Sequence, residues 1–332
     1  MSELYPLLMS AVFDPRPWGT TDLSPIYPNH RVDEKIGESW LTGEHCTVAN
    51  GPLRGKSLGD LTTEFGQQLV GEVPNPKRFP LLLKFLFPND KLSVQVHPDD
   101  ETARGVGLPC GKTECWYVAH AKPGAQIALG LKPGVTRHDL EQAIQENRAE
   151  EVLNWVNIFP GEMIYVAGGT VHTLGPGSVL VETQQQSDTT YRLYDYGRPR
   201  ELHLKEGLAA VKEKVGSGKV IRPAPVTMNG CGNRHAPLIA SPCFVVDMFE
   251  LKGPHEFRPA ERTQNKSVQI LVAVDGCAVV EVAGAEPVTF AKGDAVVVPA
   301  SVDAFSIKPQ WNVEILKAYV PGDHVDEPRT RI

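Results

Sequence analysis

The segment GEMIYVAG (residues 161–168) contains a glycine turn, an acidic residue, a run of β-forming residues and a turn of small residues, in that order. The segment GDAVVVPA (residues 293–300) repeats the same order of residue types. Short β-rich runs bounded by glycine and proline are typical of antiparallel sandwiches and barrels, not of alternating βαβ units. The repeat therefore predicts two related β-barrels, in which both segments form the same barrel strand.

Outward from these two segments, the sequence predicts further strands in both halves of the chain. The clearest cover residues 92–97, 113–119, 126–129, 162–166, 179–184, 244–251, 268–274, 278–282 and 295–299. Helices are predicted at residues 57–69, 136–155 and 202–215. Ser57 and Thr136 each precede an aspartate by three residues, which is typical of a capping box at the start of a helix. We expect a mainly β protein with helical additions.

Composition excludes several classes of protein. The net charge is -7 and the basic residues are scattered, whereas a nucleic-acid surface needs them clustered. No apolar run approaches the ~18 residues that a membrane span needs. The N-terminus carries an acid, Glu3, where an export signal would be basic. Since the six cysteines form no C-x-x-C pair, we expect reduced thiols and a cytoplasmic location. The sequence leaves the oligomeric state open.

The first group of candidate metal ligands lies in the segment LSVQVHPDD (residues 92–100). Gln95 and His97 are two residues apart in an alternating run, so their side chains project from the same face of a strand. Pro98 cannot continue the ladder, which places His97 at the rim of the barrel.

The second group lies in the segments GKTECWYV (residues 111–118) and YVAGGTVH (residues 165–172). Lys112 and Glu114 share a strand face, and a buried glutamate needs a cation, which could be a metal ion or the lysine. His172 follows a small-residue turn that returns it toward the barrel. Two histidines, a glutamate and a glutamine oxygen suit Zn²⁺, although Fe²⁺, Mn²⁺ or Co²⁺ would accept the same ligands.

Chain length and a linker predict two domains. A chain of 332 residues fits about two domains, and residues 216–237 are rich in Gly, Pro and Asn without periodicity. We expect a metal-binding catalytic barrel with helices at residues 1–225 and a second β domain at residues 226–332. Ungapped comparison of the two repeat segments sets Ala304 opposite His172, so the second barrel is predicted to be degenerate and to hold no metal.

Four motifs together resemble the signature segments of short-form type I phosphomannose isomerases, also called mannose-6-phosphate isomerases. They are QVHPDD (residues 95–100), GKTECWYV (111–118), GGTVHTLGPG (168–177) and VETQQQSDTTYRLYDYGR (181–198). The resemblance implies a cupin, or jelly-roll β-barrel, catalytic domain with a second, degenerate cupin-like barrel. It also implies a zinc-dependent aldose-ketose isomerase, which interconverts mannose 6-phosphate and fructose 6-phosphate through an enediol(ate), with a small sugar phosphate as its partner.

The resemblance also implies roles for single residues. One Zn²⁺ per chain is expected at Gln95, His97, Glu114 and His172. Arg192 matches the family's catalytic arginine, and Glu182 and Lys112 match residues that line the same pocket.

The chemistry of the reaction assigns tasks to these groups. Arg192 and zinc would stabilise the enediolate, and Glu182 is the candidate base, with Lys112 as the competing proton carrier. Lys112, Lys132 and Arg198 are candidate partners of the substrate phosphate.

Two other functions fit the same ligands. One is a cupin oxygenase that uses Fe²⁺, which would depend on O₂. The other is a non-catalytic sugar-binding cupin. The presence of Glu182, Lys112 and Arg192 argues against this second alternative, because a simple binder does not need all three.

Overall fold

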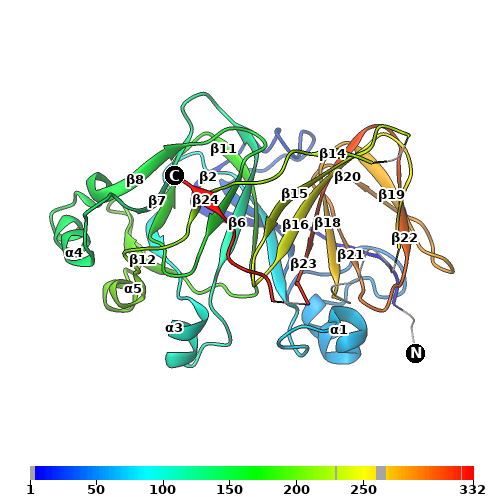
Figure 1. The fold of residues 1–332 in the computed structure, drawn as a ribbon, viewed down its shortest axis with the longest axis horizontal. Coiled ribbons are helices and arrows are strands. Elements are labelled where there is room, and N and C mark those ends of the chain that lie inside the picture. The colour runs from blue at the N-terminus through cyan, green and yellow to red at the C-terminus, as the bar shows by residue number, and fades with distance from the viewer. Residues whose placement is uncertain (1–3, 229, 259–266, 323) are drawn as a thin grey trace.

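The computed structural model describes residues 4–228, 230–258, 267–322 and 324–332. Two β units lie side by side along the long axis of the molecule, with most helices at the outer end of one unit and along its lower edge (Figure 1). Each unit consists of two sheets that enclose an apolar interior. The protein is mainly β, as the sequence predicts.

The first unit combines an eight-stranded sheet and a five-stranded sheet. The larger sheet has the order β2-β3-β4-β11-β6-β9-β13-β24 and the smaller one β12-β5-β10-β7-β8. In chain order the strands are β2 (Val12–Thr20), β3 (Ile36–Thr42), β4 (Leu81–Leu86), β5 (Val94–Val96), β6 (Glu114–Ala121), β7 (Gln126–Leu131), β8 (Leu153–Asn157), β9 (Met163–Val166), β10 (His172–Leu174), β11 (Ser178–Gln185), β12 (Tyr191–Tyr194), β13 (Gly218–Val220) and β24 (Thr330–Arg331).

The second unit combines a seven-stranded sheet and a four-stranded sheet. Their orders are β1-β21-β18-β23-β16-β15-β14 and β17-β22-β19-β20. In chain order the strands are β1 (Leu7–Leu8), β14 (Val226–Thr227), β15 (Arg234–Ala240), β16 (Val245–Leu251), β17 (His255–Phe257), β18 (Gln269–Asp275), β19 (Cys277–Glu281), β20 (Val288–Ala291), β21 (Ala295–Val298), β22 (Phe305–Pro309) and β23 (Val313–Tyr319).

The two units have the same core topology. The order β4-β11-β6-β9 in the first unit matches β16-β23-β18-β21 in the second, and β5-β10-β7 matches β17-β22-β19. The two repeat segments contribute the equivalent strands β9 and β21. Gly161 and Gly293, which precede them, both adopt a positive φ, of 84° and 92°. This is the left-handed region in which glycine is favoured, so the same turn introduces the same strand twice.

Each end of the chain joins the sheet of the other unit. β1 pairs with β21, and β24 pairs with β13. The segment predicted as a linker contains the short strands β13 and β14. The first strand of the chain thus belongs to the second unit, and the last strand belongs to the first unit. A domain boundary between residues 225 and 226 stays a prediction.

The helices differ from the prediction in their lengths. The structure has α1 (Leu58–Phe65), α2 (Gln67–Val70), α3 (Asp100–Gly105), α4 (Arg137–Gln145), α5 (Leu204–Ala210) and a 3₁₀ helix η1 (Ala149–Val152). The predicted N-caps are confirmed, since Ser57 and Thr136 accept hydrogen bonds from the amides of Asp60 and Asp139. The prediction of one helix over residues 136–155 is wrong in its second half.

Two observations explain where that helix ends. Asn147 adopts a left-handed φ of 57° two residues after the last residue of α4, which prevents the helix from continuing. The residues from Leu153 onward pair with β7 as strand β8. Sheet pairing therefore overrides the local preference for helix in these residues. The short helix α3 is a separate difference, because the sequence did not predict it.

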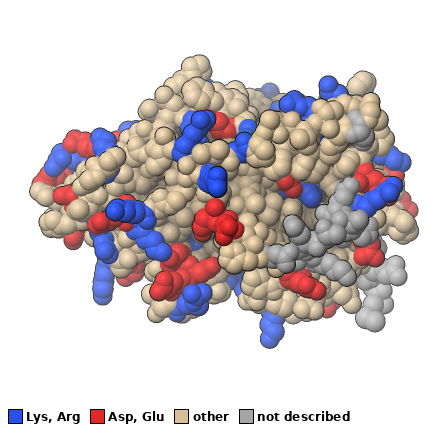
Figure 2. All heavy atoms as spheres, viewed as in Figure 1, with Lys and Arg blue, Asp and Glu red and all other residues tan. Residues whose placement is uncertain are grey.

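On the face shown in Figure 2, Lys and Arg side chains are interspersed with Asp and Glu. This face carries no broad basic stripe. In the described part of the chain, no helix is long and apolar enough to cross a bilayer.

Candidate metal centre

Three strands bring the candidate ligands together at one end of the first barrel. Gln95 lies in β5, directly opposite His172 in β10, and Glu114 begins β6. Gly168 and Gly169, in the turn before His172, allow a close approach. A Cβ on Gly168 would lie 2.6 Å from Cα of Asp99, just after His97. The small-residue turn therefore packs against the loop that follows His97, and this packing holds His172 beside it.

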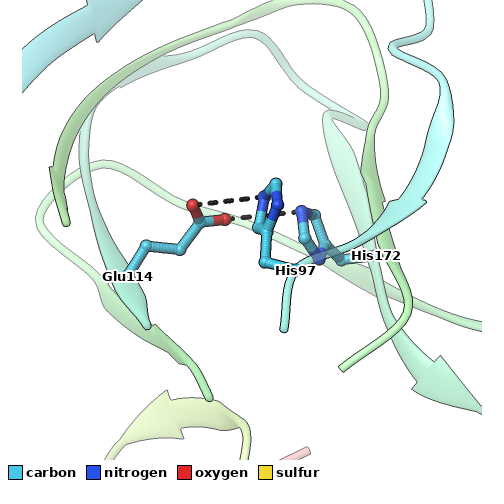
Figure 3. A group of neighbouring side chains, drawn as sticks. All are labelled: His97, Glu114 and His172. Atoms are coloured by element: carbon cyan, nitrogen blue, oxygen red, sulfur yellow. Dashed lines mark ion pairs between the residues drawn. The ribbon is translucent and has the colours of Figure 1, made fainter. Parts of the chain in front are cut away.

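Figure 3 shows His97 and His172 facing the carboxylate of Glu114. Nε2 of His97 lies 3.5 Å from Oε2 of Glu114, and Nε2 of His172 lies 3.4 Å from Oε1. One ligand atom from each of the three residues lies within 4.8 Å of the other two. Ligand atoms on one tetrahedral zinc stand about 3.3–3.6 Å apart, so side-chain shifts of about 1 Å would let the three share an ion. Gln95 lies beside these groups, with its amide Nε2 at 3.2 Å from Nε2 of His172, while its Oε1 accepts a hydrogen bond of 3.1 Å from the hydroxyl of Ser93. The amide must turn over to present its oxygen as a ligand.

Backbone carbonyls orient both imidazoles for metal binding. Nδ1 of His97 lies 2.9 Å from the carbonyl oxygen of Thr189, and Nδ1 of His172 lies 2.9 Å from that of Thr170. A carbonyl oxygen can only accept, so Nδ1 carries the proton in each ring. The unprotonated Nε2 atoms then present their lone pairs toward Glu114.

The burial of this cluster favours a bound cation. Glu114 is completely buried, and neither carboxylate oxygen has a hydrogen-bond partner among the described residues. Burial, with a further contribution from Glu182, raises the pKa of Glu114 to about 8. Burial also lowers the pKa of His172 to about 4 and that of His97 well below its usual value, which keeps both imidazoles neutral. Neutral imidazole is the form that binds metal.

Lys112 lies beside the cluster as well. Its Nζ is 3.5 Å from Oε2 of Glu114 and 3.2 Å from Nε2 of His97. The sequence suggested either a metal ion or Lys112 as the cation for the buried glutamate. The structure places Lys112 and two potential metal-binding histidines next to Glu114.

The cluster borders a cavity of about 400 Å³ in the first barrel. Gln95, His172, Lys112, Glu182 and Arg192 all line it, so the structure brings the candidate catalytic residues to one pocket. Glu182 is buried in β11, where Oε2 accepts a hydrogen bond of 2.9 Å from Nε1 of Trp116. The volume is in the range of small-molecule sites.

Comparison with known proteins decides the family. A family model described as the phosphomannose isomerase type I catalytic domain matches residues 20–109. The mannose-6-phosphate isomerase of Streptococcus mutans serotype c is 32% identical over 324 residues, which cover 95% of this chain and 98% of that protein. The chain belongs to the type I phosphomannose isomerase family.

Two further relatives agree with this membership. The putative mannose-6-phosphate isomerase YvyI of Bacillus subtilis is 33% identical over 317 residues, which cover 91% of this chain and 96% of that protein. The crystal structure of the mannose 6-phosphate isomerase from Bacillus subtilis superposes with a TM-score of 0.83 at 31% identity, and the match covers 95% of this chain and 99% of that one. The family resemblance and the cupin fold expected from the sequence are therefore confirmed.

A buried ion-pair network, which the sequence reasoning missed, lies next to Glu182 in this phosphomannose isomerase fold. Nζ of Lys84 is 3.3 Å from Oε1 of Glu182 and 3.2 Å from Oε2 of Glu38. Burial would raise the pKa of Glu38, but Lys84 and Arg16 outweigh it and lower that pKa to about 2. A sequence signal existed, because Lys84 is the one charge in the buried strand LLLKFL (residues 81–86) and such a charge must be paired.

The basic residues that line the cavity are only partly those that the sequence predicts. Arg192 lies opposite Gln95 in the β12–β5 ladder and lines the cavity. Arg198 does not line it and instead pairs with Asp90 and Asp195 at 2.9 and 3.2 Å. Lys132 is exposed on the turn after β7 and is likewise not a lining residue. Arg16 and Arg200, which the sequence reasoning did not consider, do line the cavity.

Proposed function

We propose that this chain interconverts mannose 6-phosphate and fructose 6-phosphate, with one Zn²⁺ held by Gln95, His97, Glu114 and His172. Membership of the phosphomannose isomerase family supports the reaction. The observation that carries the metal proposal is the carboxylate of Glu114. It is fully buried, lacks hydrogen bonds to described residues and faces the lone pairs of two neutral imidazoles.

The donor set supports zinc as the ion. Imidazole nitrogens with a carboxylate and an amide oxygen form a mixed set that Zn²⁺ accepts in catalytic sites. A bound zinc ion would act as a Lewis acid, polarising sugar oxygens and stabilising negative charge that develops on them.

Glu182 is proposed as the base that moves the proton between the two reacting carbons. Its Oε2 is held by Trp116, while Oε1 has an ion pair with Lys84 but no hydrogen bond among the described residues. The carboxylate is thus oriented and still has an acceptor for the proton of the sugar. Lys112, whose ammonium group is 3.5 Å from Glu114, remains the competing proton carrier.

Arg192 is proposed to stabilise the enediolate. Its Nη1 donates to the carbonyl of Glu201, and its buried Nε has no hydrogen-bond partner in the described part of the chain. A donor that is kept without a partner in a buried pocket is ready for charge that appears only during the reaction.

The experiment that tests this function combines metal analysis with a coupled assay for fructose 6-phosphate formed from mannose 6-phosphate. We expect about one zinc ion per chain. We also expect isomerase activity that a chelator abolishes and that added zinc restores. Turnover that requires O₂ and iron would instead support the cupin oxygenase. Sugar binding without turnover in the zinc-loaded protein would support the binding-module alternative.

The role of Arg192 has its own test. Arg192→Ala should lower kcat by about a hundredfold or more, because one donor to the transition state is lost, while the zinc content stays that of the parent. Steady-state kinetics with parallel metal analysis measures both quantities. A kcat within threefold of the parent at full zinc content would remove Arg192 from the mechanism.

A cytoplasmic location is also proposed. All six cysteines are unpaired in the structure, which suits a reducing compartment.

A further inference from the structure

The cavity of the first barrel carries an excess of positive charge. Its charged lining consists of five lysine and arginine side chains and three carboxylates. The chain as a whole has a net charge of -7, so this excess is local and opposes the general field. A phosphate monoester carries a charge of about −1.5 to −2 at pH 7, so its partners should be found among the cationic groups that line the cavity.

Both lysines that line the cavity already pair with carboxylates of the protein. Lys84 is buried between Glu38 and Glu182, and Lys112 lies against the metal cluster. The arginines are nearer to solvent, with 30% of the Arg16 side chain and 24% of the Arg200 side chain exposed. The anion-binding groups that remain are therefore at the mouth of the cavity.

The reacting end of the substrate belongs at the other, buried end, next to Glu182 and the metal cluster. The phosphate of an open-chain hexose 6-phosphate is four carbons away from the carbon pair that exchanges the proton. With that pair at Glu182, the phosphate reaches outward to the mouth. A contact to such a remote group contributes to the affinity for the substrate more than to the chemical step.

Arg200 is oriented toward this mouth by a buried carboxylate. Asp195 is 3% exposed and accepts hydrogen bonds of 2.7 Å from both Nε and Nη2 of Arg200. This bidentate contact fixes the plane of the guanidinium and leaves Nη1 without a hydrogen bond to any described residue. A guanidinium fixed in this way is suited to phosphate, and it loses little side-chain entropy on binding.

Arg16 approaches the same mouth from the other sheet. It lies in β2, the edge strand of the larger sheet, whereas Arg200 follows β12, the edge strand of the smaller sheet. Asp14 at 2.7 Å and Glu38 at 3.3 Å hold the guanidinium of Arg16 in place. The repulsion between the three arginines is also visible in Arg192, whose pKa is lowered by burial first and then by Arg200 and Arg16.

We propose that Arg200 binds the phosphate of the sugar-phosphate substrate at the mouth of the cavity, that Arg16 adds positive charge from the opposite sheet, and that Asp195 is the positioning residue for Arg200. The proposal rests on the isomerase function. It replaces Lys132 and Arg198 as phosphate partners, since neither lines the cavity.

The chain offers a matched control for the test. Arg198 also pairs with Asp195, but it does not line the cavity. We compare Arg200→Gln, Arg16→Gln and Arg198→Gln in the zinc-loaded protein. The readouts are KM and kcat for mannose 6-phosphate and the inhibition constant of sorbitol 6-phosphate, which has the phosphate but no carbonyl group. Thermal melting monitors folding, and Arg200→Lys tests the charge without the planar fork.

Arg200→Gln should raise both KM and the inhibition constant by about tenfold to a hundredfold, with kcat changed far less, because a charge-assisted contact to the phosphate is lost. Arg16→Gln should raise them less, Arg200→Lys should recover part of the affinity, and Arg198→Gln should leave both within twofold. An inhibition constant within twofold of the parent in folded Arg200→Gln would overturn the proposal. So would an equal effect of Arg198→Gln.

Failure of the isomerase function would appear differently, as a zinc-loaded parent without turnover. Calorimetric titration with sorbitol 6-phosphate still reads the phosphate site in that case. Equal affinity of the parent and Arg200→Gln in this titration would again overturn it.

Discussion

The two barrels of this protein share a strand order but differ at the positions where the first one holds its candidate metal ligands. Glu114 lies opposite Val166 in the β6–β9 ladder, and Gln269 lies opposite Val298 in the equivalent β18–β21 ladder. The strand equivalent to β10, which begins with His172, is β22, which begins with buried Phe305. The same scaffold therefore carries candidate metal ligands in one barrel, and a glutamine and a phenylalanine at the equivalent positions of the other.

The interiors next to these positions differ in a second way. Glu182 lies between Trp116 and Lys84 in its ladders, and the equivalent position in β23 is Lys317, between Leu271 and Asp247. In the first barrel the lysine is on β4 and the carboxylate on β11, whereas in the second barrel the carboxylate is on β16 and the lysine on β23. Nζ of Lys317 lies over the rings of Phe249, Phe257 and Tyr319, at 4.7–5.6 Å from their centroids. Aromatic side chains therefore surround this lysine, whereas Lys84 in the first barrel lies between two carboxylates.

The largest expected effect is at the metal cluster. His172→Ala should lose bound metal and, with it, several kcal/mol of transition-state stabilisation, about a thousandfold in rate. Gln269→Ala changes the position equivalent to Glu114 in the second barrel and should leave zinc content and kcat near those of the parent. Zinc analysis and steady-state assays measure both variants. Equal loss of zinc in the two would contradict the assignment of the cluster to the first barrel.

The ion pairs of Lys84 and Lys317 should also contribute differently to the stability of the protein. Lys84→Met would leave Glu182 buried without its cation and Glu38 with Arg16 alone, which should lower the free energy of unfolding by about 3–5 kcal/mol. Lys317→Met should cost less, on the order of 1–2 kcal/mol, because its side chain is 12% exposed and Asp247 is 3.9 Å away. Denaturant unfolding curves measure the difference. A larger loss for Lys317→Met would show that the second barrel depends more on its charges.

A third effect appears only when the pH is lowered. Lys84 and Arg16 hold the pKa of Glu38 at about 2 in the folded state, against 4.5 for a free glutamate carboxyl. A lowered pKa contributes stability that is fully present above pH ~4.5 and is lost as the pH falls toward 2. The shift corresponds to about 3 kcal/mol. The unfolding free energy of metal-free Glu38→Gln should therefore fall less steeply than that of the parent between pH 5 and 2. Parallel curves would mean that Glu38 is not held as an ion by Lys84 and Arg16.

The sequence predicted what depends on local pattern. Strand alternation indicates that Gln95 and His97 share a face, and the turn before His172 indicates a return to the barrel. Order along the chain does not show which distant strands become neighbours. Lys84 was therefore missed, because its partners Glu38 and Glu182 come from β3 and β11 on either side of it. Likewise, Arg198 and Arg200 look equivalent in the sequence and both pair with Asp195, and only the folded structure shows that Arg200 alone of the two lines the cavity.

Tertiary pairing also explains the other errors. The residues after Asn147 have helical periodicity, yet those from Leu153 onward form β8, because β7 offers a ladder to them. The crossing of β1 and β24 between the units has no local sequence signal, since each strand has only two residues.

Diffraction from zinc-loaded crystals at energies on both sides of the zinc absorption edge would show directly whether the first barrel holds the metal ion. We expect one anomalous peak per chain, at about 2.0–2.2 Å from Nε2 of His97, Nε2 of His172 and a carboxylate oxygen of Glu114. A peak in the second barrel, or a first barrel whose two imidazoles stand more than about 6 Å apart without a shared ion, would contradict it.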